Sequence, residues 1–252
     1  MPRKRFGQHF LHQPDVIARI VDAIHPQPGE HIIEIGPGLG ALTLPLLQGL
    51  GRLEVVELDR DVIPLLQTRC AGHGELIVHA ADALRFDFSP LAAGAKLRLV
   101  GNLPYNISTP LLFHLLGQAE HIRDMHFMLQ KEVVERMVAA PGSADYGRLT
   151  VTLAARARCE LLFRVKPGAF LPPPKVDSAV VRILPQPPPF AVRDLAAYDR
   201  VTTAAFGKRR KTLANGLKGL LSAEQISAAG LDPRIRAEQL SPAQFAMLAN
   251  QL

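Results

Sequence analysis

A short apolar segment that runs directly into a glycine-rich turn constrains the fold of this chain more than any other feature. His31–Ile35 has the composition of a buried strand, and Gly36, Pro37, Gly38, Leu39 and Gly40 follow it without a break. This order is typical of the first unit of an open, mostly parallel sheet with helices on both faces. Glycines at such a turn let the backbone approach a ligand closely. The segment therefore predicts an α/β fold with a ligand site at the carboxyl end of this strand.

The first two thirds of the chain repeat this alternation of apolar runs and helical patterns. Further strands are expected at Arg52–Leu58, Glu75–His79, Lys96–Val100 and Met125–Leu129. Two more β-rich stretches, Cys159–Val165 and Ser178–Leu184, flank a proline-rich loop and indicate an antiparallel hairpin at the sheet edge. The pattern predicts a Rossmann-like, mostly parallel sheet with an antiparallel edge hairpin.

A proline-rich linker divides the chain. Pro185–Phe190 has four prolines in six residues, which neither a helix nor a central strand accommodates. We expect one domain over residues 1–186 and a small all-helical domain over residues 190–252. Helices are predicted at Asp15–Ile24, from near Gly147, and at Leu195–Phe206, Thr212–Leu221 and Pro242–Leu252, the last with Ser241 as its N-cap.

The charge balance and the cysteines limit the classes of partner. The chain carries 29 basic and 23 acidic residues, a net charge of +6, which favours a polyanionic partner, although many basic proteins bind none. No apolar run approaches the roughly 18 residues of a membrane helix, and no targeting peptide is evident, so a cytoplasmic protein with no membrane contact is expected. Cys70 and Cys159 lack metal-ligand spacing. We predict no metal, and two reduced, buried thiols.

The glycine turn and two acidic residues form the predicted cofactor site. Gly36 and Gly38 bring the backbone close to the ligand, and Glu57, at the end of the second strand, is placed to bind ribose hydroxyls. Asp82 follows the third strand, where a carboxylate can accept a hydrogen bond from an adenine amino group. With Ala41 the turn also satisfies a dinucleotide-binding fingerprint. A tight strand-to-helix turn that binds no ligand is a further alternative. Three other carboxylates are interpreted as solvated charges or helix caps and left out of the site: Asp59, Asp61 and Asp87.

The tetrapeptide that follows the fourth strand indicates the chemistry. It consists of Asn102, Leu103, Pro104 and Tyr105. The exocyclic nitrogen of adenine is a poor nucleophile, and donating its hydrogens to Asn102 Oδ1 and the Leu103 carbonyl would help to localise its lone pair. Pro104 fixes the turn, and Tyr105 offers a ring on which a flipped base can stack. This motif therefore favours amino methylation of adenine, although an ordinary strand-end turn is the plain alternative.

A second aromatic residue precedes a proline loop. Phe170 begins the run Phe-Leu-Pro-Pro-Pro-Lys-Val, in which the prolines would hold the ring rigidly against the other face of a base. A core phenylalanine before a loop fits the pattern equally well. Both interpretations stay open.

Six segments together resemble the KsgA/RsmA family of small-subunit ribosomal RNA adenine dimethyltransferases, and the resemblance covers nearly the whole chain. They are KRFGQHFL at Lys4–Leu11, EIGPGLGALT at Glu34–Thr43, VVELDRD at Val55–Asp61, GNLPYNIST at Gly101–Thr109, HFMLQKEV at His126–Val133 and FLPPPKVDSAVVR at Phe170–Arg182. The resemblance implies a class I methyltransferase domain followed by a small helical domain.

The resemblance also implies the cofactor, S-adenosylmethionine, and the residues that contact it. These contacts carry over to His9, Leu11, Gly36, Glu57, Asp82 and Asn102. His9 departs from the family pattern, which has asparagine there, and an imidazole cannot present an amide's donor and acceptor together. The implied substrate is a pair of adjacent adenosines near the 3-prime end of small-subunit (16S) ribosomal RNA, each methylated twice, on an assembling subunit. The implied enzyme acts as a monomer.

Two basic clusters are predicted to dock RNA. One consists of Arg3, Lys4 and Arg5 before the first helix, and the other of Lys208, Arg209, Arg210 and Lys211 at the start of a helix.

Three other functions are considered. A large-subunit ribosomal RNA methyltransferase of the antibiotic-resistance type shares the cofactor motifs, but the loop at Phe170–Arg182 argues against it. A noncatalytic assembly factor would not need Glu57, Asp82 and Asn102, and a nicotinamide enzyme would need a catalytic pair for hydride transfer.

Overall fold

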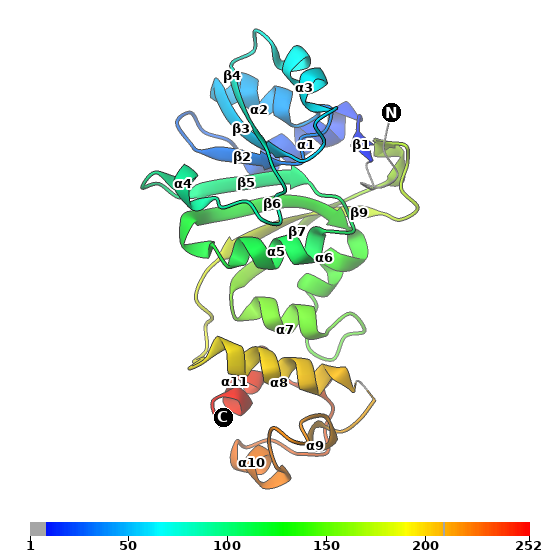
Figure 1. The fold of residues 1–252 in the computed structure, drawn as a ribbon. Helices are drawn as coiled ribbons and strands as arrows, with labels where there is room; N and C mark the ends of the chain where they lie inside the picture. Colours follow the sequence, from blue (N-terminus) through cyan, green and yellow to red (C-terminus); the bar gives the residue numbers. More distant parts are fainter. Residues whose placement is uncertain (1–8, 209) are drawn as a thin grey trace. The chain divides into compact units, whose positions relative to one another are not determined.

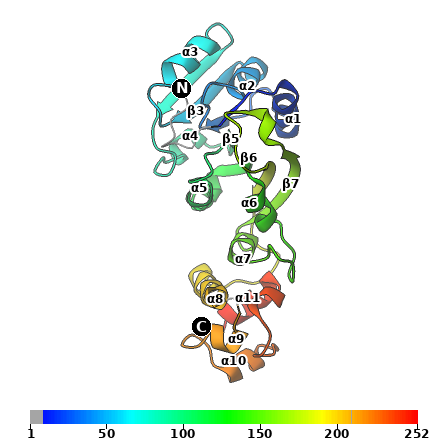
Figure 2. The same cartoon turned by 90° about the vertical axis from the view of Figure 1, so that its right-hand side faces the viewer.

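The computed structural model describes residues 9–208 and 210–252, and its contacts divide the chain into two compact units. Unit 1 takes in the chain up to Val134 together with Glu160–Pro185, and unit 2 takes in Glu135–Cys159 together with Gln186–Leu252. Figures 1 and 2 show the same chain in two views. The two units are described in turn.

Unit 1 is built on a seven-stranded sheet of order β4-β3-β2-β5-β6-β9-β7. The strands β2 to β6 pair in parallel, and β9 runs antiparallel to β6, so the predicted mostly parallel sheet with an antiparallel edge is confirmed. Their bounds are β2 Ile32–Ile35, β3 Arg52–Glu57, β4 Glu75–Ala80, β5 Leu97–Asn102, β6 Ile122–Gln130, β7 Ala157–Val165 and β9 Ser178–Pro185. Each contains most of a stretch predicted from its apolar residues.

Helices cover both faces of this sheet, so its central strands are buried along most of their length. Residues of α1, α2 and α3 share one core with β2, β3 and β5, and α5 lies on the opposite side in both views (Figures 1 and 2). The bounds are α1 Pro14–Ile24, α2 Thr43–Leu50, α3 Ile63–Cys70, α4 Ser89–Ala92, α5 Ser108–Leu116 and α6 Lys131–Met137. The helix predicted at Asp15–Ile24 is confirmed, with Pro14 in its first turn.

A buried arginine fixes the end of α1 to the sheet. Arg98 on β5 donates from Nη2 to the carbonyl oxygen of Ile24 at 2.7 Å and from Nε to Asp124 on β6 at 2.9 Å. The guanidinium therefore satisfies a carbonyl at the helix terminus that has no partner within the helix. This contact orders the start of the chain that leads into β2.

A two-stranded sheet, β1 (Phe10–Leu11) with β8 (Phe170–Leu171), joins the start of the described chain to the proline loop. The strands are antiparallel, with Leu11 opposite Phe170. Neither strand is predicted from the sequence, because two residues are too few to show a period.

Unit 2 is helical in its C-terminal part, as predicted. Its helices are α7 Arg148–Ala154, α8 Leu195–Gly207, α9 Leu213–Gly216, α10 Ala223–Ala228 and α11 Pro242–Ala249. Ser241 caps α11 by accepting from the Gln244 amide, which confirms the predicted N-cap. The helix predicted at Thr212–Leu221 is shorter, since it ends at Gly216, and α10 is not predicted.

The unit boundary differs from the predicted domains in one respect. A break at Pro185 is found, but Glu135–Cys159, predicted within residues 1–186, groups with the helical unit. Two tyrosines explain why: Tyr146 Oη donates to the Leu240 carbonyl at 2.6 Å, and Tyr198 Oη donates to the Val151 carbonyl at 3.0 Å. Their rings lie in one core with α8 and α11. Glu135–Cys159 therefore packs with the helical unit, although it precedes the proline-rich linker in the sequence.

The two cysteines are free thiols, and only Cys70 is fully buried, so the expectation of two buried thiols is wrong for Cys159. Burial nevertheless raises the pKa of the Cys159 thiol to about 12. The thiol is therefore a poor nucleophile at neutral pH.

Candidate active site

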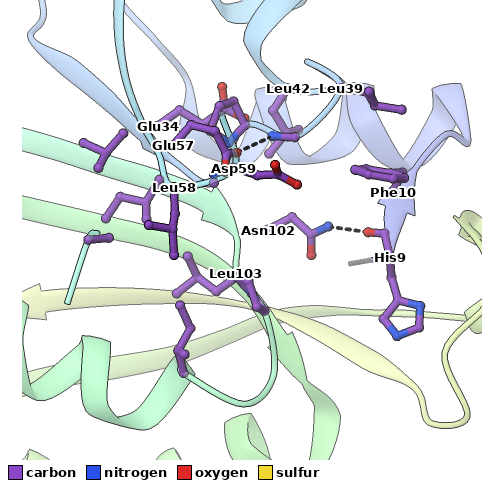
Figure 3. A pocket seen from close by; sticks show the side chains of 18 of the residues that line it. His9, Phe10, Glu34, Leu39, Leu42, Glu57, Leu58, Asp59, Asn102 and Leu103 are labelled. Carbon is purple, nitrogen blue, oxygen red and sulfur yellow. Dashed lines mark hydrogen bonds between the residues drawn. The ribbon is translucent and has the colours of Figure 1, made fainter. Parts of the chain in front are cut away.

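A cavity of about 340 Å³ opens where β2, β3, β4 and β5 end (Figure 3). Its volume lies within the range of small-molecule sites, about 300–1,000 Å³. The carboxyl edge of a parallel sheet is where open α/β folds bind ligands. Ten of the predicted site residues line the cavity: His9, Leu11, Gly36, Gly38, Glu57, Asp82, Asn102, Leu103, Pro104 and Tyr105.

The glycine turn forms one wall of the cavity. Gly36 and Gly38 have φ angles of +67° and +54°, a region that side chains other than glycine rarely adopt. The Gly36 amide donates to the Val56 carbonyl at 2.9 Å. A Cβ on Gly38 would lie 3.2 Å from the ring of Phe10. Glycine is required here both for the backbone conformation and for the close approach of β1.

Glu57 ends β3 as a buried carboxylate beside this turn. It is 7% exposed, and its oxygens accept from the Gly38 amide at 3.3 Å and from the Asp59 amide at 2.8 Å. Burial raises its pKa, while these two backbone donors lower it. A carboxylate has about four lone-pair sites, so Glu57 keeps capacity to accept from further hydroxyl donors.

Glu34 lines the cavity and is missed by the sequence analysis. This residue of β2 is 2% exposed, and Thr43 Oγ1 donates to it at 2.6 Å. Burial raises its pKa to about 8, and the nearby Glu57 adds to the effect. Glu34 is therefore neutral at pH 7. A single carboxylate inside an otherwise apolar strand is the signal that indicates such a group.

Asp59 also lines the cavity, so its exclusion as a solvated charge is wrong. It is 5% exposed. Its carboxylate accepts from the Asp61 amide at 3.2 Å within the turn before α3, and the N-cap residue of α3 is Val62, so Asp59 does not cap that helix. Asp82, predicted in the site, is half-buried and accepts from the Leu84 amide at 3.0 Å, which orders the loop after β4.

Asn102, the last residue of β5, points into the cavity from the opposite side (Figure 3). Its Nδ2 donates to the carbonyl oxygen of His9 at 3.0 Å, and this bond orients the amide so that Oδ1 is left as an acceptor. Gly101 makes the position possible, because a Cβ there would collide with the Ile35 carbonyl of β2. The site therefore contains the acceptor that the motif predicts.

Tyr105 is held at both ends of its side chain. Its hydroxyl shares a hydrogen bond with Ser178 Oγ at 2.7 Å, and its ring stacks on that of His9, with centroids 5.7 Å apart and planes at 28°. Burial raises the pKa of the phenol, so it stays protonated at neutral pH. Tyr105 is thus a neutral, restrained aromatic surface at the edge of the cavity.

Phe170, the other predicted stacking residue, lies elsewhere. Its ring is 2% exposed and packs in the core of unit 1, and it does not line the cavity. The antiparallel pairing of β8 with β1 carries the side chain inward, opposite Leu11. In this conformation the core alternative holds. Stacking on a base would require the ring to leave the core.

A model of the ribosomal RNA adenine dimethylase family matches residues 2–252 of the chain. The chain belongs to this family. A ribosomal RNA small subunit methyltransferase A from Pseudomonas aeruginosa is 58% identical over 252 residues, which cover 99% of the chain and 94% of the relative. The protein of the same name from Chromobacterium violaceum is 55% identical, covering 100% of the chain and 96% of the relative.

Two solved structures share the fold of this dimethylase along almost its whole length. A dimethyladenosine transferase from Plasmodium falciparum is 25% identical with a TM-score of 0.78, covering 95% of the chain and 96% of that structure. The 23S rRNA methyltransferase ErmE is 26% identical with a TM-score of 0.75, covering 96% of the chain and 99% of that structure. The chain therefore shares the class I methyltransferase fold with a dimethyladenosine transferase and a 23S rRNA methyltransferase.

The basic clusters of this dimethylase are only partly described. Arg3, Lys4, Arg5 and Arg209 lie outside the described residues. Lys208, Arg210 and Lys211 are exposed in the turn between α8 and α9, which corrects the expectation that they begin a helix. Their docking role remains a prediction.

Over residues 9–208 and 210–252, no helix has both the length and the apolar character needed to cross a membrane. The same residues contain no group of three or more histidine, cysteine or acidic side chains arranged to hold a metal ion.

Proposed function

We propose that this chain transfers methyl groups from S-adenosylmethionine to N6 of two adjacent adenosines near the 3-prime end of small-subunit (16S) ribosomal RNA, giving dimethyladenosines. The observation that carries the proposal is the Asn102 amide, which the His9 carbonyl orients so that Oδ1 is available as an acceptor at the cavity. We further propose that the enzyme acts as a monomer, in the cytoplasm, on an assembling small subunit.

The residues around the cavity fit the cofactor. Glu57 would accept hydrogen bonds from its ribose hydroxyls, Asp82 would accept from its adenine amino group, and the Gly36–Gly38 backbone would lie close to it. Leu11 adds an apolar contact at the same cavity. When bound, the sulfonium supplies an activated methyl group.

The tetrapeptide Asn102–Tyr105 would bind and orient the target adenine. Asn102 Oδ1 and the Leu103 carbonyl would accept the two hydrogens of the adenine amine, which localises the lone pair on nitrogen. Tyr105 would stack on the extruded base. No strong general base is required, because fixed acceptors and positioning supply most of the acceleration.

The small subunit is favoured over the large subunit as the source of the RNA. The relatives named for the small subunit are 55–58% identical to the chain, whereas ErmE, named for 23S RNA, is 26% identical. The presence of Glu57, Asp82 and Asn102 around one cavity argues against a noncatalytic assembly factor.

Primer extension on 16S ribosomal RNA from a strain that lacks this gene tests the proposal. Dimethyladenosine blocks reverse transcriptase, so the two adjacent stops should vanish on deletion and return with the wild-type gene. An Asn102→Ala gene should fail to restore them. The assignment would be overturned if the stops persisted in the deletion strain, or if the stops that depend on this gene were found on large-subunit RNA instead.

A further inference from the structure

Three segments that are distant in sequence meet at His9. Its carbonyl accepts from Asn102 Nδ2, its Nδ1 lies 2.8 Å from the Pro172 carbonyl oxygen, and its ring stacks on Tyr105. A carbonyl oxygen can only accept, so Nδ1 carries the proton and donates. His9 therefore ties the end of β5 and the turn after it to the proline loop.

The backbone and the side chain of His9 make different contacts. The bond to Asn102 uses the carbonyl, which any residue would provide, while both contacts of the imidazole are with the tyrosine and the proline loop. In Figure 3 the carbonyl faces Asn102 and the ring points away from Glu57 and Asp59. The imidazole is thus directed toward the half of the site that would hold the base.

An asparagine at this position could not make the same set of contacts. It has an amide that can donate to Pro172, but no ring to stack on Tyr105. The stack and the Ser178 hydrogen bond restrain Tyr105 at its two ends, which reduces the rotamer freedom that the ring would lose on binding a base.

We propose that His9 is a positioning residue that holds Tyr105 ready to stack on the target adenine, and that its imidazole is not a ligand of the cofactor. This inference rests on the proposed function. It assigns a role in substrate binding to His9, which among the cofactor contacts carried over from the family is the residue that departs from the family pattern.

Kinetics of three variants test this role. The measurements are kcat/KM for immature small subunits at saturating S-adenosylmethionine, and the cofactor Kd by calorimetry. His9→Ala should lower kcat/KM by about tenfold, as expected for the loss of one aromatic stack and one hydrogen bond, with the cofactor Kd changed by less than about twofold. His9→Phe, which keeps a ring, should recover to within about threefold of wild type. His12→Ala is the matched control, because His12 is an exposed histidine of the same segment that does not line the cavity.

A second measurement reads the stack without activity. The chain has three tyrosines, so 3-fluorotyrosine labelling gives three fluorine signals, and Tyr146 and Tyr198 in unit 2 serve as references. His9→Ala should shift the Tyr105 signal alone, and His12→Ala should shift none.

Two outcomes would overturn the proposal. One is a cofactor Kd that rises about tenfold in His9→Ala while kcat/KM for subunits at saturating cofactor stays at the wild-type value, which would make His9 a cofactor ligand. The other is a Tyr105 signal and kinetics that match His12→Ala. Failure of the proposed function differs from both, because wild-type protein would then not methylate immature subunits, while the fluorine signals and cofactor Kd would still report on His9.

Discussion

The two halves of the cavity are held in different ways. In the cofactor half, the hydrogen bonds to Glu57 and Glu34 join residues 2, 9 and 19 positions apart. In the base half, those of Asn102, Tyr105 and His9 join residues 93, 73 and 163 positions apart. The first half is ordered by a strand, a turn and the next strand, whereas the second depends on side chains from distant segments.

This difference has a chemical consequence. The cofactor half offers backbone amides and buried carboxylates whose positions follow from the local chain, and one of these carboxylates is neutral at pH 7. The base half offers one oriented amide and one restrained ring. We therefore expect changes in the first half to alter cofactor binding and stability, and changes in the second to alter methyl transfer.

The largest expected effect is in the base half. Asn102→Ala should lower the methylation rate by about 100- to 1,000-fold, because it removes the acceptor that orients the amine. The cofactor Kd should change by less than about threefold, since in the proposed function Asn102 would contact the cofactor only in part. Single-turnover methylation and calorimetry measure the two effects. If Asn102→Ala methylated RNA at the wild-type rate, the base half would not control methyl transfer and the proposed difference between the two halves would be wrong.

The next effect concerns the stability of the cofactor half. The pKa of Glu34 is about 8 in the folded protein, above its ordinary value, so its contribution to stability is fully present below about pH 4.5 and is lost as the pH rises through 8. The free energy of unfolding of the wild type should therefore fall by about 2–3 kcal/mol between pH 5 and 7 relative to that of Glu34→Gln, whose side chain stays neutral.

Urea unfolding at each pH gives this difference directly. Below about pH 4.5 the difference in unfolding free energy between the two proteins should become constant, because Glu34 is then neutral in both the folded and the unfolded state. Curves that run parallel from pH 5 to 7 would show that Glu34 is ionised throughout, and the cofactor half would then hold two charged carboxylates.

A smaller effect is expected from the ribose contact. Glu57→Ala should weaken cofactor binding by about 10- to 30-fold, within the range of charge-assisted hydrogen bonds, while kcat at saturating cofactor changes little. Glu120→Ala is the control, since that side chain is 82% exposed in the same unit. A lowered kcat with an unchanged cofactor Kd would place Glu57 functionally with the base half.

The smallest effect lies outside the cavity. Replacing Lys208, Arg209, Arg210 and Lys211 with alanine should flatten the salt dependence of binding to immature subunits by roughly 2 units, as expected for two to three lost phosphate contacts. Neither half of the cavity should change, so the cofactor Kd should equal that of wild type. Replacing two other exposed cations of unit 2, Lys218 and Arg236, is the control. An unchanged slope would identify the cluster as ordinary surface charge.

Local patterns along the chain were sufficient for much of this structure. The seven sheet strands, the antiparallel edge, the glycine turn and the N-cap at Ser241 all follow from hydrophobic periodicity and from residues with restricted backbone conformations. Most cavity residues at the strand ends were also predictable, because the carboxyl ends of parallel strands meet at one edge, although Asp59 after β3 was wrongly excluded.

Other features depend on contacts that no local pattern encodes. Glu135–Cys159 joins the helical unit through the contacts of Tyr146 and Val151. Phe170 turns into the core because β8 pairs with β1. The imidazole of His9 turns toward Tyr105 and Pro172, where packing brings a donor, an acceptor and a ring together. Periodicity determines which elements form, and the burial of side chains from distant segments determines which residues meet.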